Sequence, residues 1–212
     1  MTLAKICGLS TPEAVAAALA GGAAYLGFVF FAASPRDIAP HAAARLAGPA
    51  RGRAAIVAVT VDPDDALIDR LTSILHPDLI QLHGRESPVR TREIAARAGV
   101  GVIKALRVAQ AADLAAALDY EAVAEHLMFD APPPEASARP GGTGAAFDAA
   151  ILAGRRFARP WFLAGGLDPW NVARAIGQSA APMVDVSTGV ERGPGLKDPA
   201  QIEAFLEAVR RA

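Results

Sequence analysis

Short runs of apolar residues alternate along the chain with alanine-rich stretches. The runs are nearly continuous in apolar side chains, which is typical of strands that are buried on both faces. They predict eight strands, at Leu3–Cys7, Tyr25–Phe30, Ala54–Val59, Leu79–Leu82, Val100–Leu106, His126–Phe129, Trp161–Leu163 and Met183–Val186.

A stretch with helical character follows each predicted strand. Several of these stretches open with an N-cap residue and a proline in the first turn, as in Thr11-Pro12 and Ser87-Pro88. The predicted helices are Thr11–Ala20, His41–Ala47, Pro63–Leu75, Ser87–Ala98, Ala109–Ala117, Ala145–Leu152, Pro169–Ile176 and Pro199–Arg211. Eight strand–helix pairs, at roughly 26 residues per pair, come close to the minimum for a (β/α)8 barrel. We therefore predict an α/β protein, a single (β/α)8 TIM barrel over residues 1–212.

An open, doubly wound sheet is the alternative architecture. Such a sheet usually carries a glycine-rich turn after its first strand. Here the first strand runs into Lys5-Ile-Cys-Gly-Leu-Ser10, without a G-x-G-x-x-G pattern. No stretch is long enough to link two domains, and the proline-rich segment Pro132–Pro140 predicts a mobile loop within the domain.

Composition limits the classes of partner. The chain has 212 residues, of which 52% are hydrophobic, and its net charge of -1 offers no excess positive charge for binding nucleic acid. No apolar run reaches the roughly 18 residues of a membrane-spanning helix. The single cysteine cannot form an intramolecular disulfide or a Cys-rich zinc site. We expect a soluble, cytoplasmic protein that binds neither nucleic acid nor membrane.

In such barrels the active site lies at the carboxyl ends of the strands. Glycines at the ends of late strands allow backbone N–H groups to approach an anion closely. A phosphorylated small molecule is therefore the expected ligand, although the same glycines could serve only tight turns. The candidate phosphate-binding residues are Gly142, Thr143, Gly144, Gly165, Gly166, Ser187, Thr188 and Gly189.

Cys7 and Asp130 are the candidate catalytic pair. A lone cysteine on an apolar strand usually fills the core, but Cys7 ends its strand at the active face, where a nearby cation such as Lys5 would favour the thiolate. Asp130 ends an apolar strand and could be a catalytic acid or a structural hydrogen-bonding group. A thiolate base opposite a carboxylic acid suits proton transfer at a sugar carbon and needs no metal or redox cofactor.

Three further residues are candidates for binding substrate. Arg36 follows Ser34-Pro35 in a loop over the face, where it could bind a carboxylate or be a solvated surface residue. His83 could face the ligand, or its ring nitrogens could form hydrogen bonds with nearby backbone groups. Asp185 could bind ligand hydroxyls or anchor a network at the barrel end.

Several of these residues fall in short motifs that follow one another along the chain in the order found in a known family. They are Lys5-Ile-Cys-Gly-Leu9, Ser34-Pro-Arg36, Gln81-Leu-His-Gly84, Phe129-Asp130, Gly141-Gly-Thr-Gly144, Leu163-Ala-Gly-Gly-Leu167 and Val184-Asp-Val-Ser-Thr-Gly-Val-Glu191. In these motifs the chain resembles the phosphoribosylanthranilate isomerases of tryptophan biosynthesis. The resemblance runs over nearly the whole chain.

The resemblance implies an Amadori rearrangement of N-(5-phospho-β-D-ribosyl)anthranilate to 1-(2-carboxyphenylamino)-1-deoxy-D-ribulose 5-phosphate. It implies that Asp130 is the general acid that opens the ribose ring, and that Cys7, as thiolate, removes the proton from C2. Arg36 matches the binder of the anthranilate carboxylate, and Asp185 matches an acid near the ribose hydroxyls. The family includes monomers and homodimers and uses no cofactor or metal.

Two other functions stay open at this point. The sister isomerase of histidine biosynthesis performs the same rearrangement. Resemblance to that enzyme would imply a pair of catalytic aspartates and two half-barrel repeats, and no clear half-repeat is visible here. A non-catalytic barrel that binds a phosphorylated ligand would keep the glycine loops and lack an acid–base pair.

Overall fold

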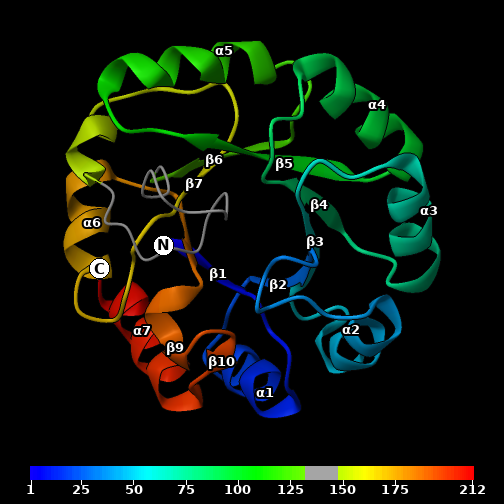
Figure 1. Ribbon diagram of the computed structural model, residues 1–212. Coiled ribbons are helices and arrows are strands. Elements are labelled where there is room, and N and C mark those ends of the chain that lie inside the picture. The colour runs from blue at the N-terminus through cyan, green and yellow to red at the C-terminus, as the bar shows by residue number, and fades with distance from the viewer. Residues whose placement is uncertain (132–147) are drawn as a thin grey trace.

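Eight parallel strands close into a barrel in the computed structural model, which describes residues 1–131 and 148–212. The strands follow chain order around the barrel, and β8 pairs with β1 to close it (Figure 1). The predicted barrel is confirmed, with strand boundaries that differ from the predictions by at most one residue. The strands are β1 (Leu3–Cys7), β2 (Tyr25–Phe30), β3 (Ala55–Thr60), β4 (Leu79–Leu82), β5 (Gly101–Arg107), β6 (His126–Asp130), β7 (Trp161–Leu163) and β8 (Met183–Val186).

Helices surround the barrel and shield its outer wall from solvent (Figure 1). N-cap side chains start several of them, as where Thr11 accepts from the backbone N–H of Ala14 and Ser87 from that of Arg90. The α-helices within the described residues are α1 (Pro12–Ala20), α2 (Pro40–Ala47), α3 (Asp65–Ile74), α4 (Pro88–Ala98), α5 (Ala117–Tyr120), α6 (Val172–Ser179) and α7 (Pro199–Arg211).

Two of the predicted helices take a different form. The stretch predicted as a helix at Ala109–Ala117 is the 3-10 helix η2 (Ala111–Ala116), which continues into the short α5. The helix predicted at Ala145–Leu152 is the 3-10 helix η3 (Ala149–Leu152) as far as the described residues show it. Alanine favours a helix wherever it occurs, but it does not form the apolar stripe that marks the buried face of a helix. A run of alanines therefore does not predict how long the helix is.

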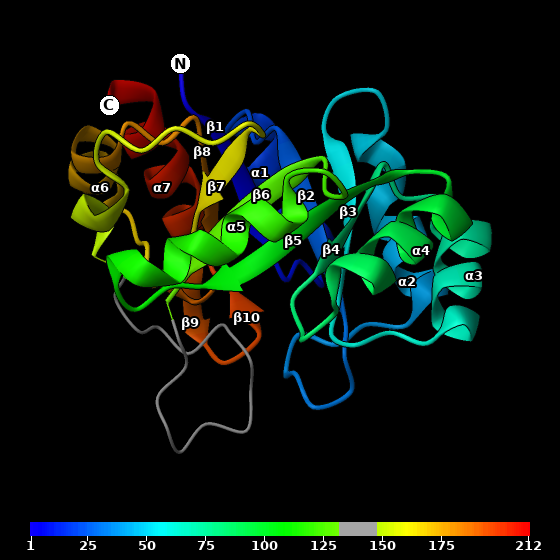
Figure 2. The ribbon, with the colours of Figure 1, turned by 90° about the horizontal axis from the view of Figure 1, so that it is seen from above.

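A small hairpin after β8 was not predicted. The 3-10 helix η4 (Thr188–Val190) leads into β9 (Glu191–Gly193), which pairs antiparallel with β10 (Leu196–Lys197). Figure 2 shows this hairpin at one end of the barrel, on the opposite side from the two chain termini. It extends from the carboxyl end of β8 and therefore lies at the face where the strands end.

The core has two layers, which follow from the alternation of side chains along each strand. One layer fills the barrel itself and includes Cys7, Val57, Ile103, Met128 and Phe162. The larger layer packs the outer faces of the strands against the helices. The interior layer matters for function because its uppermost residues reach the mouth of the barrel.

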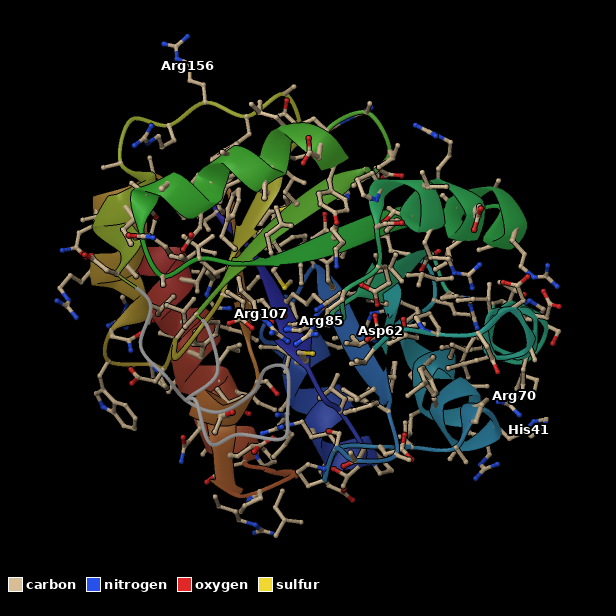
Figure 3. The ribbon with its side chains drawn as sticks, turned by 45° about the horizontal axis from the view of Figure 1, so that its top comes forward. His41, Asp62, Arg70, Arg85, Arg107 and Arg156 are labelled. Carbon is tan, nitrogen blue, oxygen red and sulfur yellow. The ribbon has the colours of Figure 1, made fainter. Side chains whose placement is uncertain are left out.

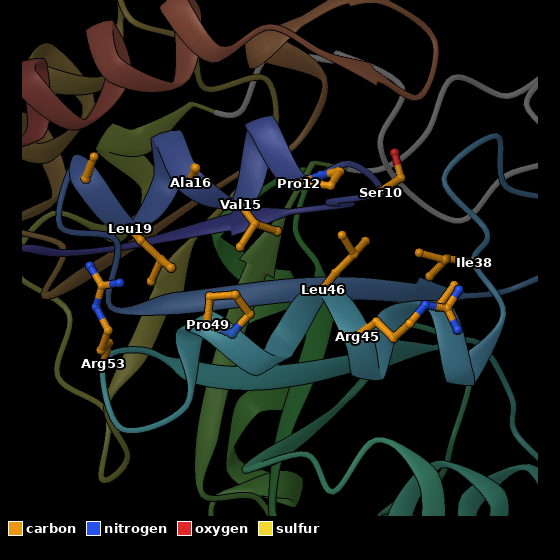
Figure 4. Close-up of a pocket in the computed structure, with 12 residues that line it drawn as sticks. Ser10, Pro12, Val15, Ala16, Leu19, Ile38, Arg45, Leu46, Pro49 and Arg53 are labelled. Carbon is orange, nitrogen blue, oxygen red and sulfur yellow. The ribbon is translucent and has the colours of Figure 1, made fainter.

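No helix within the described residues is both long and apolar enough to cross a membrane. A groove with a volume of about 610 Å³ lies between α1 and α2 on the outer wall, lined by Val15, Leu19, Ile38 and Leu46 among others (Figure 4). It contains none of the residues predicted for the site. The predicted loop Pro132–Pro140 lies outside the described residues.

Candidate active site

Polar side chains line the inside of the barrel at the carboxyl ends of the strands. Lys5 and Cys7 are two residues apart on β1, so both point inward from the same strand. Asp185 lies beside Lys5 on the neighbouring strand β8. Gln81 on β4 and Asp130 at the end of β6 are buried on the same interior side. Strand alternation thus gathers these groups from distant parts of the sequence.

Lys5 forms the centre of a buried charge cluster. Its ammonium donates to Oδ1 of Asp185 at 2.8 Å, and Lys5 is fully buried. Burial alone would lower the pKa of Lys5, but the charge of Asp185 and the hydrogen bonds to Asp185 and Cys7 outweigh it and raise the pKa. Lys5 therefore stays a cation next to the thiol. Asp185 therefore belongs to a buried charge network at the barrel end, and its binding of ligand hydroxyls stays a prediction.

The Cys7 thiol points into the barrel beside Lys5. Burial raises the pKa of Cys7, and the negative charge of Asp185 acts in the same direction. Lys5 and Lys197 oppose this by favouring the thiolate, without overcoming burial. In the resting site Cys7 is thus mainly a neutral thiol whose thiolate is a stronger base than an ordinary one.

Arg36 is buried. This excludes the second interpretation given above, in which it is a solvated surface residue. Its Nε and one terminal nitrogen donate to the two carboxylate oxygens of Glu191 at 2.7 and 2.8 Å, and the same terminal nitrogen donates to Oγ1 of Thr188 at 3.1 Å. Lys197 donates to the same carboxylate and to the backbone oxygen of Ser187. This network fastens the loop after β2 to the β9–β10 hairpin.

Gly8 makes room for this arrangement. It has a φ of +78°, in the region that favours glycine, and a Cβ atom there would lie 2.5 Å from Cδ of Arg36. The Arg36 side chain therefore passes directly over the end of β1. The Cys7-Gly8 dipeptide serves two purposes, since the first residue carries the thiol and the second admits the guanidinium beside it.

Asp130 is held by a chain of side chains from β4 and the loop after it. His83 contacts Oδ2 of Asp130 through Nε2 at 3.0 Å. The other ring nitrogen, Nδ1, lies 2.9 Å from the side-chain nitrogen of Gln81. Both ring nitrogens of His83 therefore have protein partners, and neither partner is backbone. Direct binding of substrate by His83 stays a prediction.

A cavity of about 180 Å³ opens beside Asp130 and His83. Its lining includes Arg85 and Arg107, which are exposed. Figure 3 shows both arginines projecting over the barrel mouth, whereas His41, Arg70 and Arg156 point outward at the periphery. The mouth can therefore attract an anionic ligand, although the chain as a whole carries a net charge of -1.

The predicted phosphate-binding residues lie in part at the ends of β7 and β8. Gly165 and Gly166 both have positive φ values. A Cβ at Gly189 would lie 1.9 Å from the backbone oxygen of Leu167, so the loops after β7 and β8 touch there. Gly142, Thr143 and Gly144 lie outside the described residues. Phosphate binding by any of these residues stays a prediction.

Lys5 was expected as a cation near Cys7, but three other residues that organise the site were given no role from the sequence. They are Gln81, Glu191 and Lys197. The signal for Gln81 was present, because it is a polar residue at an inward position of an apolar strand. Glu191 and Lys197 gave no such signal, since their pairing depends on a hairpin of two- and three-residue strands.

Comparisons with known proteins identify the family of this chain. A family model described as N-(5'phosphoribosyl)anthranilate (PRA) isomerase matches residues 4–208. An N-(5'-phosphoribosyl)anthranilate isomerase of Caulobacter vibrioides is 69% identical over 99% of this chain and 96% of its own length. This chain belongs to the phosphoribosylanthranilate isomerase family.

Solved structures of phosphoribosylanthranilate isomerases share the whole fold. The crystal structure of the Thermotoga maritima enzyme covers all of both chains, with a TM-score of 0.89 and 33% identity. A second crystal structure of a phosphoribosylanthranilate isomerase, in complex with reduced 1-(o-carboxyphenylamino)-1-deoxyribulose 5-phosphate, has a TM-score of 0.86 and 32% identity over the full length. Another concerns monomers generated from the dimeric T. maritima enzyme. For this chain, monomer or homodimer stays a prediction.

Membership of the phosphoribosylanthranilate isomerase family decides between the functions left open above. The chain is an isomerase of tryptophan biosynthesis. It is neither a non-catalytic barrel nor the sister enzyme of histidine biosynthesis.

Proposed function

We propose that this isomerase carries out an Amadori rearrangement with Asp130 as general acid and Cys7 as general base. The substrate is N-(5-phospho-β-D-ribosyl)anthranilate, a phosphorylated small molecule of the same class as the ligand in the related complex. The observation that carries the proposal is that a thiol and a carboxyl group both face the barrel interior at the carboxyl ends of β1 and β6. That face is where barrels of this type perform chemistry.

The first step opens the ribose ring. Asp130, as the carboxylic acid, gives its proton to the ring oxygen while the bond from that oxygen to C1 breaks. The nitrogen lone pair of the anthranilate forms the double bond to C1, which gives a cationic Schiff base. Asp130 is left as a carboxylate, and a hydrogen bond donated by Nε2 of His83, which lies 3.0 Å from Oδ2 of Asp130, would stabilise its charge.

The second step removes the proton from C2. The Cys7 thiolate takes this proton, and the electrons of the C–H bond neutralise the Schiff base to give an enamine, which tautomerises to the ketone. Thiolate is the minority form because burial raises the pKa of Cys7. The same raised pKa makes the thiolate a stronger base, and the cations Lys5 and Lys197 stabilise it when it forms.

The remaining groups bind the substrate. Arg36 would take the anthranilate carboxylate, because Glu191 aligns its guanidinium and Gly8 lets it lie over Cys7. Asp185 lies beside Lys5 and would face the ribose hydroxyls. Gly165, Gly166, Ser187, Thr188 and Gly189, with Gly142, Thr143 and Gly144, would hold the phosphate.

Growth of a tryptophan auxotroph that lacks this isomerase tests the proposal. The wild-type gene should restore growth without tryptophan, and Cys7→Ser should not, because a hydroxyl is a far poorer base near neutral pH. Growth restored equally by Cys7→Ser would reject the role of the thiol. If the wild-type gene does not restore growth although the folded protein is present in the cells, the proposed substrate is wrong.

A further inference from the structure

The side chain of Gln81 makes an incomplete set of hydrogen bonds next to the proposed acid. Its amide nitrogen donates to Nδ1 of His83 at 2.9 Å and contacts Sδ of Met128 at 3.4 Å. Its carbonyl oxygen, Oε1, is buried and has no partner among the described residues. A buried acceptor without a partner is unfavourable, and the hydrogen bond from the amide nitrogen to His83 offsets this.

The orientation of the amide fixes where the His83 ring carries its proton. An amide N–H that donates to Nδ1 requires Nδ1 to be unprotonated. The neutral ring then has its proton on Nε2 and donates it to Oδ2 of Asp130. The reversed amide would place Oε1 at Nδ1, which requires a proton there. It would also turn the lone pair of Nε2 toward Asp130.

The two arrangements place the proton of the acid on different oxygens. When Nε2–H donates to Oδ2, that oxygen is an acceptor in both charge states of Asp130, and the proton of the acid sits on Oδ1. A Cβ at Gly165 would lie 3.0 Å from Oδ1, so this oxygen lies against the glycine-rich end of β7. No hydrogen bond to Oδ1 is present within the described part of the chain, whereas Oδ2 is engaged by His83.

We propose that Gln81 is a positioning residue that holds His83 as the Nε2–H tautomer and so directs the transferable proton of Asp130 to Oδ1. The inference rests on the proposed function, in which Asp130 is the acid. In ring opening the Oδ1–H bond breaks and a new O–H bond forms on the ring oxygen. With the other tautomer the proton would lie on Oδ2 and point at His83, away from the substrate.

Nitrogen-15 NMR of the histidine rings tests this inference in the resting enzyme. The chain has four histidines, and His83→Asn serves only to assign the signals of His83. We expect the His83 ring to be protonated at Nε2 and unprotonated at Nδ1. A ring protonated at Nδ1 would overturn the inference, whatever the activity of the enzyme.

Two variants of matched size test the effect on catalysis. Gln81→Met keeps the length of the side chain and removes the N–H donor, and Met128→Leu removes the other contact of the same amide. We expect Gln81→Met to lose the single tautomer of His83 and to lower kcat about 10- to 100-fold with little change in KM. Met128→Leu should leave the tautomer and kcat near wild type.

A Gln81→Met enzyme with wild-type kcat and the wild-type tautomer would contradict the inference. So would an equal loss of kcat in the two variants, because packing alone would then explain the result. Asp130→Asn separates this inference from the proposed function. If that variant retains wild-type kcat, the proposed acid is wrong, whereas the tautomer of His83 reports on Gln81 alone.

Discussion

The Cys7 thiol is surrounded by two opposing influences. Burial and the charge of Asp185 favour the neutral thiol, whereas Lys5 and Lys197 favour the thiolate. Burial is the largest of these, so the folded pKa of Cys7 lies above that of the unfolded chain. The neutral thiol therefore stabilises the fold below the ordinary thiol pKa, and this contribution is lost as the pH rises through the folded pKa.

Alkylation of Cys7 should follow this balance. Because Cys7 is the only cysteine, the mass of the protein reports its reaction with iodoacetamide directly. We expect the rate for the ligand-free enzyme to rise with pH, with a midpoint above that of a free thiol in a model peptide. A midpoint below that of the peptide would show that the two lysines outweigh burial.

The β9–β10 hairpin is the element that holds the loop after β2 in place. Its Glu191 carboxylate accepts from both Arg36 and Lys197. Burial would raise the pKa of Glu191, but the hydrogen bond from Arg36 and the charge of Lys197 outweigh it, and the pKa is lowered. The carboxylate stabilises the fold above its unfolded pKa, and this contribution is lost as the pH falls through the folded pKa.

Glu191→Gln should therefore weaken both the fold and substrate binding. It leaves two buried cations without their anion, which costs about 3–5 kcal/mol, and it frees Arg36 from its bidentate partner. We expect a lower free energy of unfolding in urea and a raised KM. Arg192→Gln changes the exposed neighbour on the same strand and should alter neither. Equal stability of the two variants would show that the network contributes nothing.

At the scale of the whole molecule, the barrel has its proposed chemistry at the mouth and an aromatic cluster at the opposite end. His126 starts β6, with its ring 6.2 Å from that of Tyr25 and 5.7 Å from that of Phe162. Its Nδ1 is buried without a hydrogen-bond partner in the described part of the chain. Burial lowers the pKa of His126, although Glu125 acts in the opposite direction.

This end of the barrel should make the fold sensitive to acid. A lowered folded pKa means that the neutral ring stabilises the protein above about pH 6.5, and that the contribution is lost as the pH falls. His126→Phe keeps an aromatic ring and removes the titration. It should lose less stability between pH 7 and pH 5 than wild type, measured by urea unfolding, while kcat is unchanged. An exposed-site control, His41→Phe, should keep the acid sensitivity of wild type.

The sequence predicts the barrel well because each strand is an apolar run buried on both faces, such as Ala55–Thr60. It predicts Cys7 and Asp130 because each ends such a run. It does not predict the pair of Arg36 and Glu191, which are 155 residues apart and meet only through a hairpin too short to show periodicity. Nor does it predict that burial keeps Cys7 neutral at rest, since desolvation depends on the closed barrel.

The most direct test of the account is kcat of purified Cys7→Ser, Asp130→Asn and the double variant. Ring opening must precede removal of the C2 proton, so the two residues act on one sequence of steps. We expect each single variant to lower kcat by at least about 100-fold, and the double variant to be about as slow as the slower single one. Wild-type kcat in either folded single variant would contradict the central claim that this thiol and this carboxyl group share the chemistry.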